Sequence, residues 1–111
     1  MTFDDGILTI YEVTNTAEPG NKPKERILEK FKSYFGYSDI GVTRFYEAMR
    51  ANQSIEAVVN IPEWQPVSVN DVAVIGEQQY QIGFVQPTTD ENGLKITKLT
   101  LGKVENAYEI P

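Results

Sequence analysis

The sequence predicts a mainly β fold of the α+β type: a small antiparallel β-barrel with one short α-helix inserted between its second and third strands. Short segments rich in β-branched and aromatic residues are separated by clusters of turn-forming residues, which is typical of small barrels and sandwiches. The hydrophobic period also changes from helical over Val42–Ala51 to alternating over Ile55–Ile61. A chain of 111 residues is expected to form one domain, spanning residues 1–111, with a single modest core.

The first part of the chain predicts one clear strand and one ambiguous segment. Alternation over Ile7–Val13 predicts a strand, and the turn formers of residues 15–23 predict an exposed loop. Lys24–Tyr37 carries a helical stripe that slightly favours a helix, but the aromatic density over Phe31–Tyr37 favours a strand. One face of the first strand is expected to carry Ile7, Thr9, Tyr11 and Val13.

The connection 38–54 is expected to carry the helix. Its apolar residues Val42, Phe45, Tyr46 and Met49 recur at helical spacing and predict a helix, which is expected to pack on the barrel through Phe45 and Met49. Arg44, Glu47 and Arg50 lie on the opposite face, where exposure in a monomer and contact with a neighbouring subunit both remain open. These three residues are candidates for interaction or gating.

The second part of the chain predicts a strand followed by two hairpins. Ile55–Ile61 alternates, with Ile55, Ala57, Val59 and Ile61 on one face. Val72–Ile75 and Gln79–Val85 flank Gly76-Glu-Gln and predict a tight hairpin, and Asp90–Gly93 predicts the next hairpin turn. The apolar face of the second strand of the first hairpin is expected to consist of Tyr80, Ile82 and Phe84.

The last predicted strand, Leu94–Leu101, changes its hydrophobic phase. Its apolar residues form two pairs on opposite faces, Leu94 with Ile96 and Leu99 with Leu101. We therefore expect a β-bulge near Thr97 or Lys98, because one extra residue would return both pairs to the same face. Residues 105–111 are expected to form a tail.

Trp64 lies between Pro62 and Pro66, in a stretch that cannot be a central strand. An exposed Trp on a loop is a common binding anchor. A Trp folded back over the end of the barrel is an equally good interpretation. Trp64 therefore joins the candidate interaction residues with both interpretations open.

The composition excludes much of the usual catalytic chemistry. The chain has no Cys and no His, so it offers no thiol nucleophile, no imidazole base and no ordinary zinc ligand set. Its acidic pairs have no apolar setting that would shift a pKa, so catalytic, metal and cofactor sites are all expected to be absent.

The net charge of −6, with Lys and Arg dispersed, disfavours tight nucleic-acid binding. Neither a secretory signal nor an apolar run of membrane-spanning length is present, which predicts a protein made in the cytoplasm without a membrane partner.

Four segments of the chain resemble the head-closure, or stopper, proteins of long-tailed bacteriophages and Gram-positive prophages. These segments are Arg44–Asn52, Ile55–Pro62, Val74–Ile82 and Leu99–Lys103. The resemblance implies a small β-barrel with a helix or long loop between its second and third strands. It also implies that the ambiguous segment Phe31–Tyr37 is a strand.

The resemblance further implies a structural protein of the phage neck. Members of this family form a ring, typically of twelve copies, beneath the portal and its adaptor ring. They close the DNA channel after packaging and offer the docking surface for the tail, and their channel-closing element corresponds to about Ser38–Ser54 here. The expected partners are therefore further copies of the chain, a connector adaptor protein, a tail completion or tail protein, and passing DNA bound without sequence specificity. The expected location is the head-tail interface of the virion, with assembly in the host cytoplasm.

A second function class stays open beside the resemblance. A stand-alone small β-barrel can bind a peptide, a glycan or single-stranded nucleic acid through exposed aromatic side chains. The candidate residues for such a surface are Trp64, Tyr34, Phe35 and Tyr37.

Overall fold

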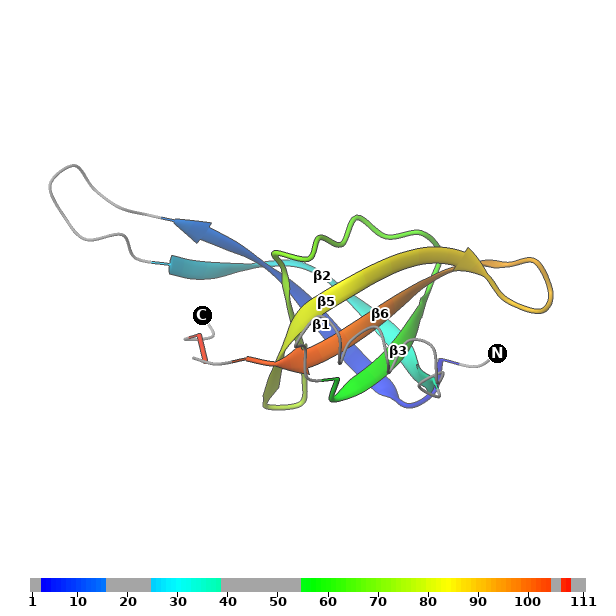
Figure 1. The fold of residues 1–111 in the computed structure, drawn as a ribbon, viewed down its shortest axis with the longest axis horizontal. Helices are drawn as coiled ribbons and strands as arrows, with labels where there is room; N and C mark the ends of the chain where they lie inside the picture. Colours follow the sequence, from blue (N-terminus) through cyan, green and yellow to red (C-terminus); the bar gives the residue numbers. More distant parts are fainter. Residues whose placement is uncertain (1–2, 16–24, 39–54, 105–106, 109–111) are drawn as a thin grey trace, which may run out of the picture.

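The computed structural model describes residues 3–15, 25–38, 55–104 and 107–108 of the chain. Within these ranges, antiparallel strands pair in a ring and close into a barrel (Figure 1). The strands are β1 (Gly6–Asn15), β2 (Glu25–Ser38), β3 (Ala57–Pro62), β4 (Val72–Ile75), β5 (Gln78–Thr89) and β6 (Lys95–Lys103). The expected antiparallel β-barrel is thus confirmed.

The predicted helix over Val42–Ala51 lies outside the described residues, and so do its three candidate residues Arg44, Glu47 and Arg50. The connection that contains them does join β2 to β3, as expected. The residues that the structure describes form no helix. In the same part of the chain there is consequently no helix with the length and apolar character that a membrane crossing requires.

The strands follow the order β1-β2-β3-β6-β5-β4 around the ring, and β4 pairs with β1 to close it. Most neighbouring strands are also neighbours in sequence, which is the usual arrangement for short connections. The exception is the step from β3 to β4, because these two strands lie on opposite sides of the ring. Residues 63–71 must therefore cross the barrel, and they contribute Glu63 and Trp64 to the site described below.

The core consists of apolar side chains that point inward from all six strands. Its buried members are Leu8, Ile10, Phe35, Val59, Ile61, Ala73, Ile82, Leu99 and Leu101. Core residues occupy alternate positions, as in Leu8 and Ile10 of β1, while β3 and β6 are also buried on their other face at Val58, Asn60, Ile96 and Thr100. The burial of Val59 and Ile61 confirms the predicted inward face of β3.

The first strand is confirmed, but its predicted apolar face is wrong at its beginning. Leu8 and Ile10 are fully buried, whereas Ile7 is 53% exposed. The pairing of β1 with β2 shifts by one residue between Ile10 and Tyr11, because Ile10 pairs with Phe31 and Tyr11 with Glu29. Lys30 is the extra residue of this β-bulge, and the shift explains why no single alternation describes the strand.

The ambiguous segment is a strand throughout its described length, because β2 runs from Glu25 to Ser38. Phe35 enters the core, as a strand assignment allows, and forms an edge-to-face contact with Tyr37 at 5.1 Å between ring centroids. The preference of the periodicity for a helix is therefore wrong. Cross-strand pairing with β1 outweighs the local helical stripe, as is common for short segments of mixed propensity.

The predicted bulge in the last strand is also wrong. The pairing of β6 with β3 is continuous from Leu101 to Ile96, without a shift near Thr97 or Lys98. The irregularity lies in β5, where Ile82 pairs with Leu101 but Phe84 pairs with Thr100, so Gly83 is the extra residue. This bulge moves Phe84 to the outer surface, where it is 51% exposed, while Ile82 remains in the core. The expected common face of these two residues is thus broken.

Both predicted hairpin turns are confirmed. Gly76 and Glu77 join β4 to β5, and Gly76 has φ of 62° while Glu77 has no positive φ, the pattern of a type II′ turn. At the second turn, the carboxylate Oδ1 of Asp90 accepts hydrogen bonds from the backbone N–H groups of Asn92 and Leu94, both at 2.9 Å. Gly93 there has φ of 79°, a conformation that favours glycine.

The outer parts of β1 and β2 form a two-stranded projection, which we term the β1–β2 arm and define as residues 12–15 and 25–28 (Figure 1). Pairing of β1 with β4 ends at Tyr11, so these residues pair only with each other. A second apolar cluster supports one face of the arm, and it consists of Tyr11, Ile27, Val72 and Val74, with Val13 and Tyr108 packed against it. Such support is needed because an isolated two-stranded ribbon is only marginally stable.

Two residues of the predicted tail, 107 and 108, are described, and the second is held against β5. The side-chain amide of Gln79 donates to the backbone oxygen of Tyr108 at 2.6 Å, and its Oε1 accepts the backbone N–H of Tyr108 at 2.8 Å. Gln79 is itself buried, so this paired contact satisfies both ends of its amide. Tyr108 therefore belongs to the packed part of the molecule.

The crossing connection 63–71 is held in place by a partly buried ion pair. Lys30 Nζ lies 2.8 Å from Asp71 Oδ2 and also donates to the backbone oxygen of Pro66 at 2.7 Å. Asp71 is buried, and the same Oδ2 accepts the backbone N–H of Ser68 at 2.8 Å. The carboxylate thus has two donors that compensate for its removal from water.

We predict that Ile82→Asp unfolds the protein whereas Phe84→Asp does not. The first change places an unpaired charge in the core, at a cost above about 4 kcal/mol, and the second acts on an exposed side chain at about 1 kcal/mol or less. Urea unfolding monitored by circular dichroism measures both. A stable Ile82→Asp variant, or an unfolded Phe84→Asp variant, would contradict the bulge at Gly83.

We also predict that Lys30→Met lowers the free energy of unfolding by roughly 2–3 kcal/mol, because it leaves the buried Asp71 carboxylate without its cation. The matched control is Lys32→Met, since the Lys32 ammonium makes only an exposed contact with Glu29 at 3.8 Å. That control should change stability by less than about 0.5 kcal/mol. Equal losses in the two variants would show that the Lys30–Asp71 pair does not secure the crossing connection.

Candidate functional site: a groove around Trp64

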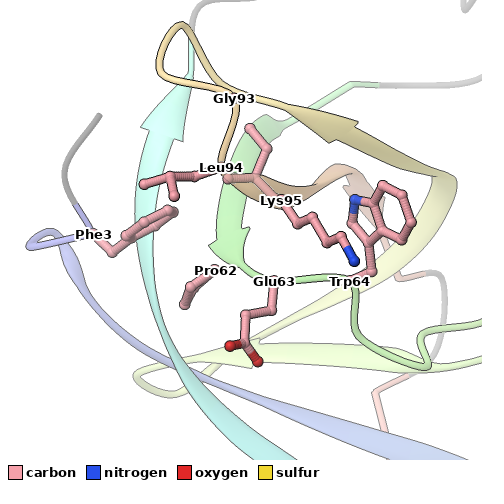
Figure 2. A pocket seen from close by; sticks show the side chains of 8 residues that line it. Phe3, Pro62, Glu63, Trp64, Gly93, Leu94 and Lys95 are labelled. Atoms are coloured by element: carbon pink, nitrogen blue, oxygen red, sulfur yellow. The ribbon is translucent and has the colours of Figure 1, made fainter.

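An apolar groove lies where the crossing connection leaves β3. It has a volume of about 750 Å³ and is formed by three segments that are distant in sequence. The lining residues are Phe3, Pro62, Glu63, Trp64, Gly93, Leu94, Lys95 and Ile96. We call it the Trp64 groove (Figure 2).

The walls of the groove follow from the alternation of β6 and from its pairing with β3. Leu99 points into the core, so Ile96 and Leu94 belong to the opposite phase, in which Ile96 is buried and Leu94 is exposed. Ile96 pairs with Pro62, which places the end of β3 beside it. Figure 2 shows the side chains of Phe3 and Leu94 pointing toward each other across the groove. Leu94 is 63% exposed, so this wall offers apolar surface to a partner.

Trp64 stands at the other end of the groove and is held by two contacts. Its indole Nε1 donates to the backbone oxygen of Thr88 at 2.9 Å, which fixes the ring against β5. The ammonium of Lys95 lies over the ring, 4.7 Å from the centroid, at a distance that gives a cation–π attraction. The indole is nevertheless 53% exposed. It is therefore both folded back onto the barrel and available for contact, so each of the two sequence-based interpretations holds in part.

The position of Trp64 depends on an unusual backbone conformation at Glu63, which has φ of 62°. For a residue with a side chain this left-handed conformation costs about 1 kcal/mol and persists only where the surroundings impose it. Here the backbone N–H of Glu63 donates to the oxygen of Lys95 at 2.8 Å, and its oxygen accepts the hydroxyl of Thr97 at 2.7 Å. These bonds fix the sharp turn that directs the chain from β3 into the groove.

The groove combines apolar walls with one charge of each sign. Glu63 and Lys95 are both exposed, and the hydrogen bond between their backbones keeps them adjacent. No ion pair joins either side chain to another residue in the described ranges. In those ranges there is also no group of three or more residues that could hold a metal ion. The arrangement is suited to binding an apolar side chain that is flanked by charges.

Of the sequence-based candidates that fall in the described ranges, Trp64 alone lines the groove. Phe35 is buried in the core and offers no binding surface, whereas Tyr34 and Tyr37 are exposed but do not line the groove. The sequence analysis missed Phe3, Leu94 and Ile96. The one available signal is that Leu94 and Ile96 share a face opposite to the core face of β6, a change of phase that the sequence analysis attributes to a bulge.

Comparison with known proteins adds no relative, because no protein-family model and no curated protein matches the chain.

We predict that Glu63→Val destabilises the protein by roughly 1–2 kcal/mol, because a β-branched side chain tolerates positive φ poorly. Glu63→Gly should stay within about 1 kcal/mol of the wild type, since relief of strain offsets the greater freedom of glycine in the unfolded chain. Glu63→Gln, which removes only the charge, is the control, and denaturant unfolding measures all three. Equal stability of the Val and Gly variants would mean that the turn carries no strain.

Proposed function

We propose that the chain is a structural protein of the phage neck: a ring subunit of the head-tail connector that closes the DNA channel after packaging and provides a docking surface for the tail. The observation that carries this proposal is the location of the long connection 39–56 between β2 and β3 of a small barrel. The resembling family has its channel-closing element at the same point of the same architecture.

The resembling segments also fall on consecutive elements of the barrel, which supports the proposal. Ile55–Pro62 covers β3, Val74–Ile82 covers the turn between β4 and β5, and Leu99–Lys103 covers the end of β6. A likeness confined to scattered surface loops would carry less weight. The remaining segment, Arg44–Asn52, contains Arg44, Glu47 and Arg50, which we propose as interaction or gating residues.

The proposed partners follow from this role. About twelve copies of the chain would surround the channel, between a connector adaptor protein on the portal side and a tail completion or tail protein. The net charge of −6 suits a channel component, because an anionic lining does not retain passing DNA. The proposal includes no catalysis, cofactor or membrane partner. Its location is the head-tail interface of the virion, after assembly in the host cytoplasm.

The Trp64 groove favours a second candidate function, a free-standing module that binds a peptide or glycan. A half-exposed indole beside apolar walls and single charges is a common feature of such sites. Single-stranded nucleic acid is a weaker ligand candidate, because the Lys and Arg residues are dispersed and outnumbered. The burial of Phe35 also removes one of the aromatics proposed for stacking.

Electron microscopy of lysates tests the proposed function directly. We expect a phage or prophage in which this gene is deleted to yield empty or leaking heads beside complete, detached tails, because packaged DNA is no longer retained. Complementation with the wild-type gene is the control and should restore joined particles. Normal infectious particles from the deletion would remove the neck assignment and favour the free-standing binding module.

A further inference from the structure

The β1–β2 arm and the Trp64 groove lie at opposite ends of the molecule. Figure 1 shows the arm projecting from one end of the long axis and the β5–β6 turn, which contributes Gly93 to the groove, at the other end. We propose that the Trp64 groove is the docking site for the β1–β2 arm of a second copy of this chain. This inference rests on the proposed function, because it specifies how neighbouring copies in a ring contact each other.

The arm presents an apolar side chain between two opposite charges. Leu28 is 55% exposed on the face that the second apolar cluster leaves uncovered. Glu12 pairs directly with Leu28 across the arm, and Arg26 lies two residues away on the same face of β2. Both charged residues are exposed, and neither forms an ion pair with another residue of the described ranges.

The groove offers the complementary arrangement. Its apolar walls can receive Leu28, while Glu63 faces Arg26 and Lys95 faces Glu12. Two opposite-charge pairs that flank one apolar contact define the orientation of the arm, because a reversed arm would place like charges together. The charges thus supply specificity, and the buried leucine and indole supply most of the attraction.

The separation of the two surfaces makes the contact intermolecular and head-to-tail. An arm cannot reach the groove of its own barrel, so each copy donates one arm and accepts another (Figure 1). A contact between two different surfaces builds a closed ring when the rotation between copies closes, and an open filament when it does not. This is the symmetry that a connector ring needs, whereas a self-complementary patch would stop at a dimer.

Cysteine cross-linking tests the contact, because the wild-type chain contains no Cys. A size-tagged Leu28→Cys variant is mixed with Leu94→Cys and briefly oxidised. We expect the mixed 28–94 dimer to exceed its statistical share over the two homodimers. The control replaces Leu94→Cys with Val69→Cys, since Val69 is also more than half exposed but does not line the groove. A statistical share in both mixtures would overturn the proposal and leave the groove to a different protein.

Charge reversal gives a second test that a folding defect cannot imitate. Arg26→Glu and Glu63→Arg should each weaken self-association about tenfold in sedimentation velocity at low salt and at protein concentrations high enough for the wild type to associate, because one attractive pair becomes repulsive. An equimolar mixture of the two variants should recover association, since every arm then meets a groove of opposite charge in an alternating assembly. A mixture that associates no better than either variant alone would contradict the proposed pairing.

The two proposals can fail separately. Leaking heads from the deleted phage together with no 28–94 cross-link would keep the neck function and exclude this contact. Specific cross-linking together with normal particles from the deletion would keep the contact and exclude the neck function.

Discussion

The ion pair between Lys30 and Asp71 secures the connection through which the barrel closes. The β3 and β4 strands lie on opposite sides of the ring, so β4 reaches β1 only because residues 63–71 cross the barrel. Asp71 directly precedes β4, and its bond to Lys30 ties the end of this connection to β2. Lys30 is available for that role because it is the extra residue of a bulge. One irregularity in a strand pair therefore contributes to the topology of the whole domain.

The groove is a consequence of the same crossing connection. The chain must turn sharply as it leaves β3, and Glu63 adopts positive φ to do so. Thr97, on an inward position of β6, supplies the hydroxyl that holds this turn and accepts the backbone N–H of Gln65 at 3.1 Å. A buried polar side chain in the barrel thus orients the exposed indole of Trp64. The left-handed backbone of Glu63 and the buried hydroxyl that holds it thus both lie beside the groove.

Most of the strands could be predicted from the sequence, but their side-chain phases only in part, because the predicted inward face of β3 is confirmed whereas β2 and β5 contain bulges that were not predicted. Turn chemistry located the hairpins around Gly76 and Asp90–Gly93, because specific residues are required there. A β-bulge inserts one residue without a strong sequence signal. It moves each side chain that follows in the strand to the opposite face of the sheet. The bulge at Gly83 was therefore assigned to the wrong strand. Trp64 could be selected as a candidate, whereas its neighbours could not, because Phe3 and Leu94 approach it only through tertiary pairing.

The size of the proposed contact bears on when a ring would form. One leucine, one indole and two exposed charge pairs make a small interface, and small interfaces are weak because association costs translational and rotational freedom. Closing a ring changes the balance between contact energy and lost freedom. The last copy to join forms two contacts but loses its translational and rotational freedom only once. Binding to an existing ring of adaptor subunits would raise the local concentration of arms and grooves in the same way. A head-to-tail contact of this strength thus favours assembly on a template and disfavours free filaments, which is the behaviour that a neck subunit requires.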